Sequence, residues 1–225
     1  MTGEKSLGLS RKRYKVLLVD DHPLVRRGLA DLIGREPDLE VCGEAADVAE
    51  ALQEIERSRP DVVVVDLTLK SGHGIDLIEK IRARDDQIRM LVSSMHDEML
   101  FAERVLRAGA MGFVSKQEPP ETLLAAVRQV LRGEVYLSVR MTSRVLHRAL
   151  GGGLPQESPL QSLSNRELEV FEMIGQGLTT LQIARRLELS RKTIETHREK
   201  IKQKLNLKNG AELSRRAVQW VLDRG

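Results

Sequence analysis

The chain has 225 residues, enough for one or two domains with buried cores. Hydrophobic residues make up 41% and charged residues 31%, and no apolar run approaches the roughly 20 residues that a membrane span needs, which excludes a membrane protein. The single cysteine, Cys42, cannot form an internal disulfide, and the first residues lack a signal-peptide pattern. We therefore expect a cytoplasmic protein in which Cys42 is a small buried residue of the core.

The net charge of +3 is unevenly distributed along the chain. Residues 1–13 carry a net +3, residues 14–133 a net −6 and residues 134–225 a net +6. Such asymmetry suggests two domains with different partners, the basic one meeting a polyanion. Ordinary solvated surface charge would give the same distribution, so charge alone does not decide.

The acidic part, residues 14–133, alternates short β-rich apolar segments with amphipathic stretches. We expect strands at residues 16–19, 39–42, 62–65, 90–94 and 112–114. Between them apolar residues recur at helical spacing, as at Leu24, Val25, Leu29, Leu32 and Ile33. Strands this continuously apolar are buried on both faces, so the pattern predicts an α/β fold, a doubly wound parallel (βα)5 sheet.

Only helical patterns follow residue 133. Residues 139–150 read as a helix, and residues 151–159 hold three glycines and two prolines, which is typical of a linker. Ser164, Thr179 and Ser190 each stand where a helix N-cap is expected, the first two with capping-box spacing, and a fourth helix is expected at 211–222. The predicted domains are 14–133, an α/β domain, 134–162, a helix and flexible linker, and 163–225, a small all-α domain.

Ligands of open parallel sheets bind outside the carboxyl ends of the strands. The predicted strands end at the following polar residues: Asp20 and Asp21, Asp66, Ser94, and Lys116. Three carboxylates at one edge would repel unless a cation lies among them, and oxygen ligands suit Mg²⁺. A carboxylate beside such a metal can act as a nucleophile in phosphoryl transfer, with an ammonium and a hydroxyl neutralising the phosphoryl oxygens. Each residue alone is more often a cap, a turn or surface; the combination favours a site.

These residues resemble the receiver domain of two-component response regulators, over roughly 14–133. The resemblance rests on LLVDDH (17–22), VVVVDLTL with Asp66, SSMHD (93–97), AGAMGF (108–113) and Lys116. It implies that a sensor histidine kinase phosphorylates Asp66, that Ser94 and Lys116 contact the phosphoryl group, and that the orientation of Phe113 follows phosphorylation. It also implies that Mg²⁺ is held by the carboxylates of Asp20, Asp21 and Asp66 and the backbone carbonyl of Thr68.

Some residues near the site depart from the commonest receiver pattern. Lys70 and Gln117 replace frequent prolines, and Met95 replaces a small residue. None of these changes removes a group that the chemistry needs. Thr68 and His96 lie where an attacking water would be helped or blocked. We expect His22, beside the acidic pair, to be a surface or capping residue rather than a metal ligand.

The all-α domain combines basic charge with a helix-turn-helix pattern. Residues 164–225 hold 13 Lys or Arg and eight Asp or Glu, and the turn 188–190 joins two predicted helices. In the second helix Ile194 and Ile201 are expected in the core, with His197 or Arg198 and Leu205. The predicted DNA contacts are Lys192, Glu195, Thr196 and Glu199 for bases, and Arg191, Lys200 and Lys202 for phosphates.

Residues 163–209 resemble the LuxR-type helix-turn-helix, and the domain order is similar to that of the NarL/FixJ class of response regulators. The resemblance implies a transcription factor that binds double-stranded DNA, that is a homodimer when phosphorylated or on DNA, and whose unphosphorylated receiver shields the recognition helix. It is not expected to be an enzyme beyond the phosphorylation and dephosphorylation of its own receiver.

Two alternatives remain open at this stage. A haloacid-dehalogenase-like phosphatase also forms an aspartyl-phosphate, but it wants a second carboxylate two residues after the nucleophile, where this chain has Thr68. An RNA- or protein-binding module is disfavoured by the 3% aromatic content, because base stacking needs aromatic side chains.

Overall fold

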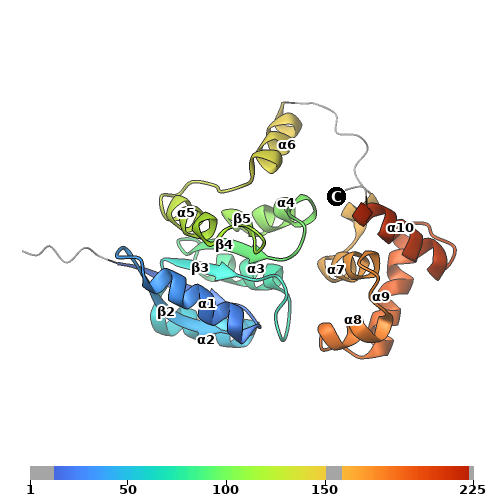
Figure 1. Ribbon diagram of the computed structural model, residues 1–225, viewed down its shortest axis with the longest axis horizontal. Coiled ribbons are helices and arrows are strands. Elements are labelled where there is room, and N and C mark those ends of the chain that lie inside the picture. Colours follow the sequence, from blue (N-terminus) through green and yellow to red (C-terminus); the bar gives the residue numbers. More distant parts are fainter. Residues whose placement is uncertain (1–12, 151–158, 223–225) are drawn as a thin grey trace, which may run out of the picture.

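The computed structural model describes residues 13–150 and 159–222. An α/β part and a part built from helices alone follow one another along the chain (Figure 1). The predicted linker at 151–159 lies outside the described residues except for Pro159. No helix in the described ranges is long and apolar enough to cross a membrane.

The α/β part contains one parallel sheet of five strands in the order β2-β1-β3-β4-β5. The strands are β1 (Tyr14–Val19), β2 (Leu39–Ala45), β3 (Val62–Val65), β4 (Arg89–Ser94) and β5 (Gly112–Ser115). All five contain the predicted segments; β3 has the predicted bounds, and the other four strands are one to three residues longer. The central strand β3 is buried along its whole length, as its unbroken run of valines indicates.

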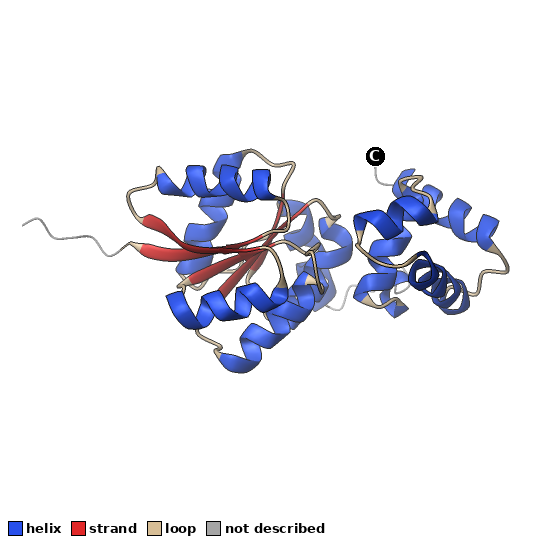
Figure 2. Cartoon of the chain, turned by 90° about the horizontal axis from the view of Figure 1, so that it is seen from below, coloured by secondary structure: helices blue, strands red, loops and turns tan. Residues whose placement is uncertain are grey.

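Helices cover both faces of the sheet (Figure 2). One face carries α1 (Pro23–Gly34) and α5 (Pro120–Leu131); the other carries α2 (Val48–Ser58), α3 (Gly74–Arg84) and α4 (Glu98–Ala108). Successive residues of each strand point to opposite faces, so Leu18 and Val64 pack in one core and Val19 and Val65 in the other. The predicted doubly wound arrangement is confirmed.

One apolar prediction is wrong in detail. Leu24 lies in α1, as its helical spacing predicts, and is 87% exposed. Cys42 is only half-buried, and its thiol donates to Ser58 Oγ at 3.4 Å, since β2 is an edge strand.

The other edge of the sheet is covered by a short crossing segment after α5. The backbone carbonyl of Tyr136 accepts from the amide of Phe113 at 3.1 Å, and its backbone amide donates to the carbonyl of Met111 at 2.9 Å. The two bonds form an isolated parallel bridge between Tyr136 and Gly112. A Cβ on Gly112 would lie 2.6 Å from the Tyr136 carbonyl oxygen, so only glycine allows this approach. The bridge occupies backbone groups of β5 that would otherwise face solvent.

The chain then runs through helices only: α6 (Val139–Ala149), the 3₁₀ turn η1 (Pro159–Ser162), α7 (Asn165–Gly175), α8 (Thr180–Arg186), α9 (Arg191–Lys204) and α10 (Gly210–Leu222). The predicted capping boxes are present, Ser164 with Glu167 at α7 and Thr179 with Gln182 at α8. Ser190 caps α9 through the Thr193 amide. The expected helices therefore begin where the caps predict.

Helix α7 forms the centre of the helical part and is buried on nearly all sides. Phe171 packs edge-to-face against Trp220 of α10, with ring centroids 5.9 Å apart. Ile194 and Ile201 of α9 are fully buried, as predicted. The apolar cluster that holds these residues is continuous with the α2–α4 face of the sheet, so the two parts of the chain pack against each other through α4 and α7.

Candidate functional site

The polar residues at the carboxyl ends of the strands meet in one cluster. Lys116 Nζ lies 2.6 Å from Asp20 Oδ2 and 2.5 Å from Asp66 Oδ2, and Ser94 Oγ donates to Asp66 Oδ1 at 2.7 Å. Asp20 and Asp66 are 2% and 5% exposed. The parallel sheet accounts for this placement, because β1, β3, β4 and β5 all end at the same edge.

The charges of the cluster are only partly balanced by the protein itself. Burial lowers the pKa of Lys116, but the carboxylates of Asp66 and Asp20 outweigh it and raise that pKa, so the ammonium stays charged. Burial raises the pKa of Asp21, and the neighbouring carboxylates raise it further, against the opposing effect of His22. One ammonium therefore faces three carboxylates, which leaves the site attractive to a cation.

The donor set fits a divalent cation. Ligand atoms of Asp20, Asp21, His22 and Asp66 all lie within 4.8 Å of one another. Asp21 Oδ1 is buried and makes no hydrogen bond within the described part of the chain, although His22 Nδ1 lies 2.5 Å from it. Carboxylate oxygens of this kind suit Mg²⁺. His22 occupies the N-cap position of α1, as expected, and its ring lies against the acidic pair.

The backbone around Asp66 is tightly packed. A Cβ on Gly74 would lie 2.2 Å from the Asp66 carbonyl oxygen, so the turn back from β3 into α3 requires glycine there. His73 caps α3 by accepting from the Ile75 amide at 3.1 Å. The predicted aromatic, Phe113, is buried in the core at 1% exposure. Asp66 is thus presented from a backbone with little room to move.

A cavity of about 330 Å³ opens over Asp66, and both parts of the chain line it. Receiver-side walls include Asp21, Ser94 and Lys116. The opposite wall is formed from the helical part by Glu172, Met173, Gln176 and Arg186. The helical part therefore borders the candidate site directly.

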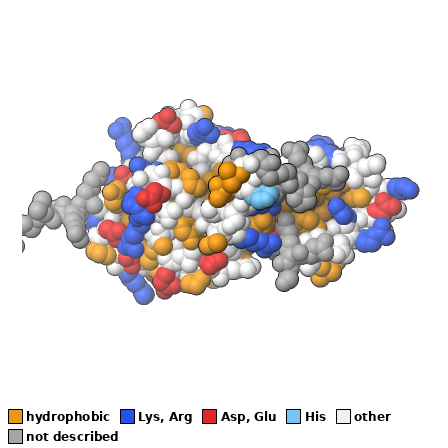
Figure 3. Space-filling model, turned by 90° about the horizontal axis from the view of Figure 1, so that it is seen from above, with side chains coloured by type: hydrophobic (Ala, Val, Ile, Leu, Met, Phe, Trp, Pro, Cys, Tyr) orange, Lys and Arg blue, Asp and Glu red, His pale blue; other side chains and the backbone are white. Residues whose placement is uncertain are grey.

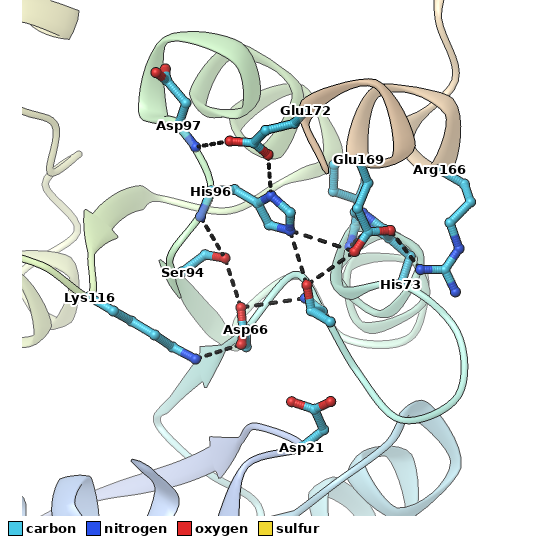
Figure 4. A network of polar contacts seen from close by, with 12 residues as sticks. Asp21, Asp66, His73, Ser94, His96, Asp97, Lys116, Arg166, Glu169 and Glu172 are labelled. Atoms are coloured by element: carbon cyan, nitrogen blue, oxygen red, sulfur yellow. Dashed lines mark hydrogen bonds and ion pairs between the residues drawn. The ribbon is translucent and has the colours of Figure 1, made fainter. Parts of the chain in front are cut away.

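A buried polar network joins the two walls (Figure 4). His96 Nδ1 donates to Glu172 Oε2 at 2.5 Å, and His96 Nε2 and Thr68 Oγ1 lie 3.0 Å apart. The Thr68 hydroxyl donates to Glu169 Oε1 at 3.1 Å, and Arg166 donates to Glu169 Oε2 at 2.6 Å. His96, Glu169 and Glu172 are 9%, 0% and 5% exposed, so the network is shielded from solvent.

The network is charged at neutral pH. Burial lowers the pKa of His96, but hydrogen bonds and charges of Glu169 and Glu172 outweigh it and raise that pKa to about 10. Burial raises the pKa of Glu169, but His96, His73 and Arg166 lower it to about 2. Burial lowers the pKa of His73 to about 4. An imidazolium thus lies between two carboxylates, with a neutral His73 nearby.

Sequence reasoning missed most of this network. It marked Thr68 and His96 as neighbours of an attacking water, but not Glu169 or Glu172, because glutamates on a charged helix normally face solvent. Their only signal is spacing: Glu169 and Glu172 stand at i and i+3 on a helix whose apolar residues occupy every side.

Helix α4 holds the following segments through further contacts. Arg104 donates to the carbonyls of Leu160, Gln161 and Leu163 and to the side chain of Asn165, at 2.8–3.3 Å. Glu98 accepts from the amide and the hydroxyl of Ser138 at the start of α6. These contacts tie α4 to η1, to the start of α7 and to the start of α6.

The predicted DNA-reading face of α9 is exposed. Lys192, Glu195, Thr196 and Glu199 are all exposed, as are Arg191 and Lys200. Lys202 is half-buried, with Nζ 2.8 Å from Glu199 Oε1. In Figure 3 Lys and Arg side chains lie on the right-hand end of the molecule, which the helical part forms.

This exposure differs from the expected shielding of the recognition helix. The elements next to the α/β part are α7 and the end of α8, through Glu172 and Arg186, and the predicted DNA-reading residues of α9 are open to solvent. Shielding of the recognition helix in the unphosphorylated chain stays a prediction.

Comparisons with known proteins agree with both halves of the architecture. Residues 16–128 match the response regulator receiver domain, and residues 161–217 match the bacterial regulatory proteins of the luxR family. The oxygen regulatory protein NreC of Staphylococcus carnosus (strain TM300) is 36% identical over 210 residues, 91% of this chain and 97% of the relative.

Solved structures of RcsB have the same domain order. RcsB from Salmonella enterica serovar Typhimurium, bound to a promoter in the presence of the phosphomimetic BeF3-, has a TM-score of 0.61 and 27% identity, covering 92% of this chain and 98% of that one. A structure of two RcsB dimers bound to two parallel DNAs has a TM-score of 0.56 and 26% identity, covering 91% and 97%.

Proposed function

The chain belongs to the two-component response regulators that join a receiver domain to a LuxR-type DNA-binding domain, and on that premise we propose that a sensor histidine kinase phosphorylates Asp66 to control its binding to double-stranded DNA. The observation that carries the assignment is the meeting of Asp66 with Lys116 and Ser94 at one sheet edge. A haloacid-dehalogenase-like phosphatase and an RNA-binding module are set aside by the family match.

The Asp66 carboxylate is the nucleophile. One of its oxygens attacks the phosphorus of a phosphohistidine, the new P–O bond forms as the P–N bond breaks, and the donor imidazole leaves with the electron pair. Lys116 and Ser94 already contact the Asp66 oxygens, so small movements bring their N–H and O–H groups to the phosphoryl oxygens. Phe113 is proposed as the aromatic that follows this change.

Mg²⁺ is proposed as the cofactor, and when bound it supplies charge neutralisation at the phosphoryl oxygens. The carboxylates of Asp20, Asp21 and Asp66 would hold it together with the backbone carbonyl of Thr68. The convergence of ligand oxygens of Asp20, Asp21 and Asp66 within 4.8 Å of one another supports this assignment.

The remaining assignments concern domains and DNA. We place the receiver at 14–133, a helix and linker at 134–162 and the DNA-binding domain at 163–225, acting in the cytoplasm. The α9 residues Lys192, Glu195, Thr196 and Glu199 would meet bases, and Arg191, Lys200 and Lys202 phosphates. The exposure of all of these except Lys202, which is half-buried, supports this role. Because RcsB binds DNA as dimers, we propose a homodimer on DNA or after phosphorylation.

Labelling with a small phosphodonor tests the phosphoacceptor. Acetyl phosphate with Mg²⁺ should add one phosphoryl group to the parent, measured by intact mass, and none to Asp66→Asn. Chelation of Mg²⁺ should abolish labelling of the parent. Label that persists on Asp66→Asn would refute the assignment of Asp66.

A further inference from the structure

The cavity over Asp66 has a wall that the receiver does not supply. Glu172, Met173 and Gln176 project from α7 and the region just after it toward the phosphoacceptor. The DNA-binding domain thereby contributes to the surroundings of a reaction that belongs to the other domain.

Two receiver loops carry the contacts to this wall. Thr68 lies two residues after Asp66, and its amide lies 3.4 Å from Asp66 Oδ1 while its hydroxyl donates to Glu169. His96 lies two residues after Ser94; its amide is 3.4 Å from Ser94 Oγ, and its ring donates to Glu172. Glu169 thus contacts the loop that follows Asp66, and Glu172 contacts the loop that follows Ser94.

The network is complete only when the domains are together. The His96 ring lies against Glu169 and Glu172, at 3.6 Å and 2.5 Å, and Arg166 donates to the second oxygen of Glu169. The Asp97 amide adds a further bond to Glu172 Oε1 at 3.3 Å. These buried hydrogen bonds favour one relative placement of the domains, because moving either domain leaves buried polar groups without partners.

The placement opposes phosphorylation. Ser94 Oγ now donates to Asp66 Oδ1 and must leave that oxygen to contact a phosphoryl oxygen, which moves the loop that ends at His96. The same loop is held by Glu172. A chain with this network intact must open it before the loop can move.

We propose that Glu169 and Glu172 of the DNA-binding domain are positioning residues for phosphorylation of the receiver: through Thr68 and His96 they hold the loops after Asp66 and Ser94 in the unphosphorylated arrangement. This inference rests on Asp66 as the phosphoacceptor. The observed labelling rate is then the rate of the open form multiplied by its population. By reciprocity, phosphorylation weakens the contact between the domains.

The test compares labelling of full-length variants by acetyl phosphate with Mg²⁺. Glu169→Gln and Glu172→Gln remove one charge each and keep the side-chain shape, and His96→Gln breaks the network from the receiver side. Glu188→Gln is the matched control, because Glu188 is exposed in the turn before α9. Labelling should accelerate roughly tenfold in Glu172→Gln and stay at the parent rate in the control. The tenfold figure is the loss of one hydrogen bond to a charged group, converted at about 1.4 kcal/mol per tenfold change in rate.

Three further readouts separate positioning from damage. Loss of label after removal of the donor should keep the parent rate in Glu169→Gln and Glu172→Gln, because the phosphorylated form is already open. The double variant His96→Gln with Glu172→Gln should gain no more than either single change. Hydrogen exchange of the Asp97 amide should accelerate in Glu172→Gln, since glutamine has one acceptor oxygen where Glu172 uses two, one for His96 and one for this amide.

Faster exchange at Asp97 with unchanged labelling of Asp66 would overturn the inference and leave the phosphoacceptor assignment intact. Slower labelling in both single glutamate variants would also overturn it, since it would show that the network assists the reaction. Label remaining on Asp66→Asn would instead refute the proposed phosphoacceptor, and this inference with it.

Discussion

Replacing Lys116 with glutamine tests whether its ammonium holds the acidic cluster together. Nζ lies 2.6 Å from Asp20 and 2.5 Å from Asp66, and the three side chains are 11%, 4% and 5% exposed. Removing one partner of a fully buried pair costs about 3–5 kcal/mol. Because this cluster borders an open cavity, screening reduces the loss, and we expect the free energy of unfolding to fall by about 2–3 kcal/mol in metal-free buffer.

Mg²⁺ should narrow this difference, because the dication neutralises the same carboxylates and no ammonium competes with it in Lys116→Gln. The variant should therefore bind Mg²⁺ more tightly than the parent, and at saturation each tenfold difference in Kd recovers about 1.4 kcal/mol of the loss. The assay is urea unfolding of the parent, Lys116→Gln and the exposed control Lys80→Gln, each in EDTA and in Mg²⁺, followed by circular dichroism. Equal stability of the parent and Lys116→Gln in EDTA would refute the reasoning, as would an equal gain from Mg²⁺ in both.

Two further predictions concern the DNA-binding domain. Lys202→Ala should weaken binding to all duplexes alike and reduce the slope of log binding constant against log salt concentration by about 0.9. Glu195→Ala should instead change the discrimination between bases at one position by about 1–3 kcal/mol. Fluorescence anisotropy over a salt series checks both, and an unchanged base preference in Glu195→Ala would mean that α9 is rotated differently on DNA. Gly175→Ala should lower the free energy of unfolding by about 1–3 kcal/mol, because its Cβ would lie 2.5 Å from the Ala217 carbonyl oxygen. Gly28→Ala, where a Cβ would have nothing within 4 Å, should not lower the free energy of unfolding. Differential scanning calorimetry in which both variants melted like the parent would contradict this prediction.

The fold could be predicted from the sequence because its signals are local. Alternation of apolar strands and amphipathic helices fixes the βα order, and the caps at Ser164, Thr179 and Ser190 fix three helix starts. The acidic cluster was also predictable, because a parallel sheet brings the carboxyl ends of its strands, where Asp20, Asp66 and Lys116 stand, to one edge.

The contact between the domains was not predictable in the same way. It joins Thr68 to Glu169 and His96 to Glu172, pairs separated by 101 and 76 residues, and no periodicity links positions so far apart.

The bridge between Tyr136 and Gly112 affects how a receiver fragment should be cut. A fragment that stops at residue 133 would leave the outer edge of β5 open, and an unpaired parallel edge is a template for intermolecular strand pairing and aggregation. Extending the fragment past Tyr136 keeps the amide of Phe113 and the carbonyl of Met111 occupied. The segment that leads out of the receiver thus also completes the hydrogen bonding of its sheet, and we expect a fragment that keeps it to aggregate less.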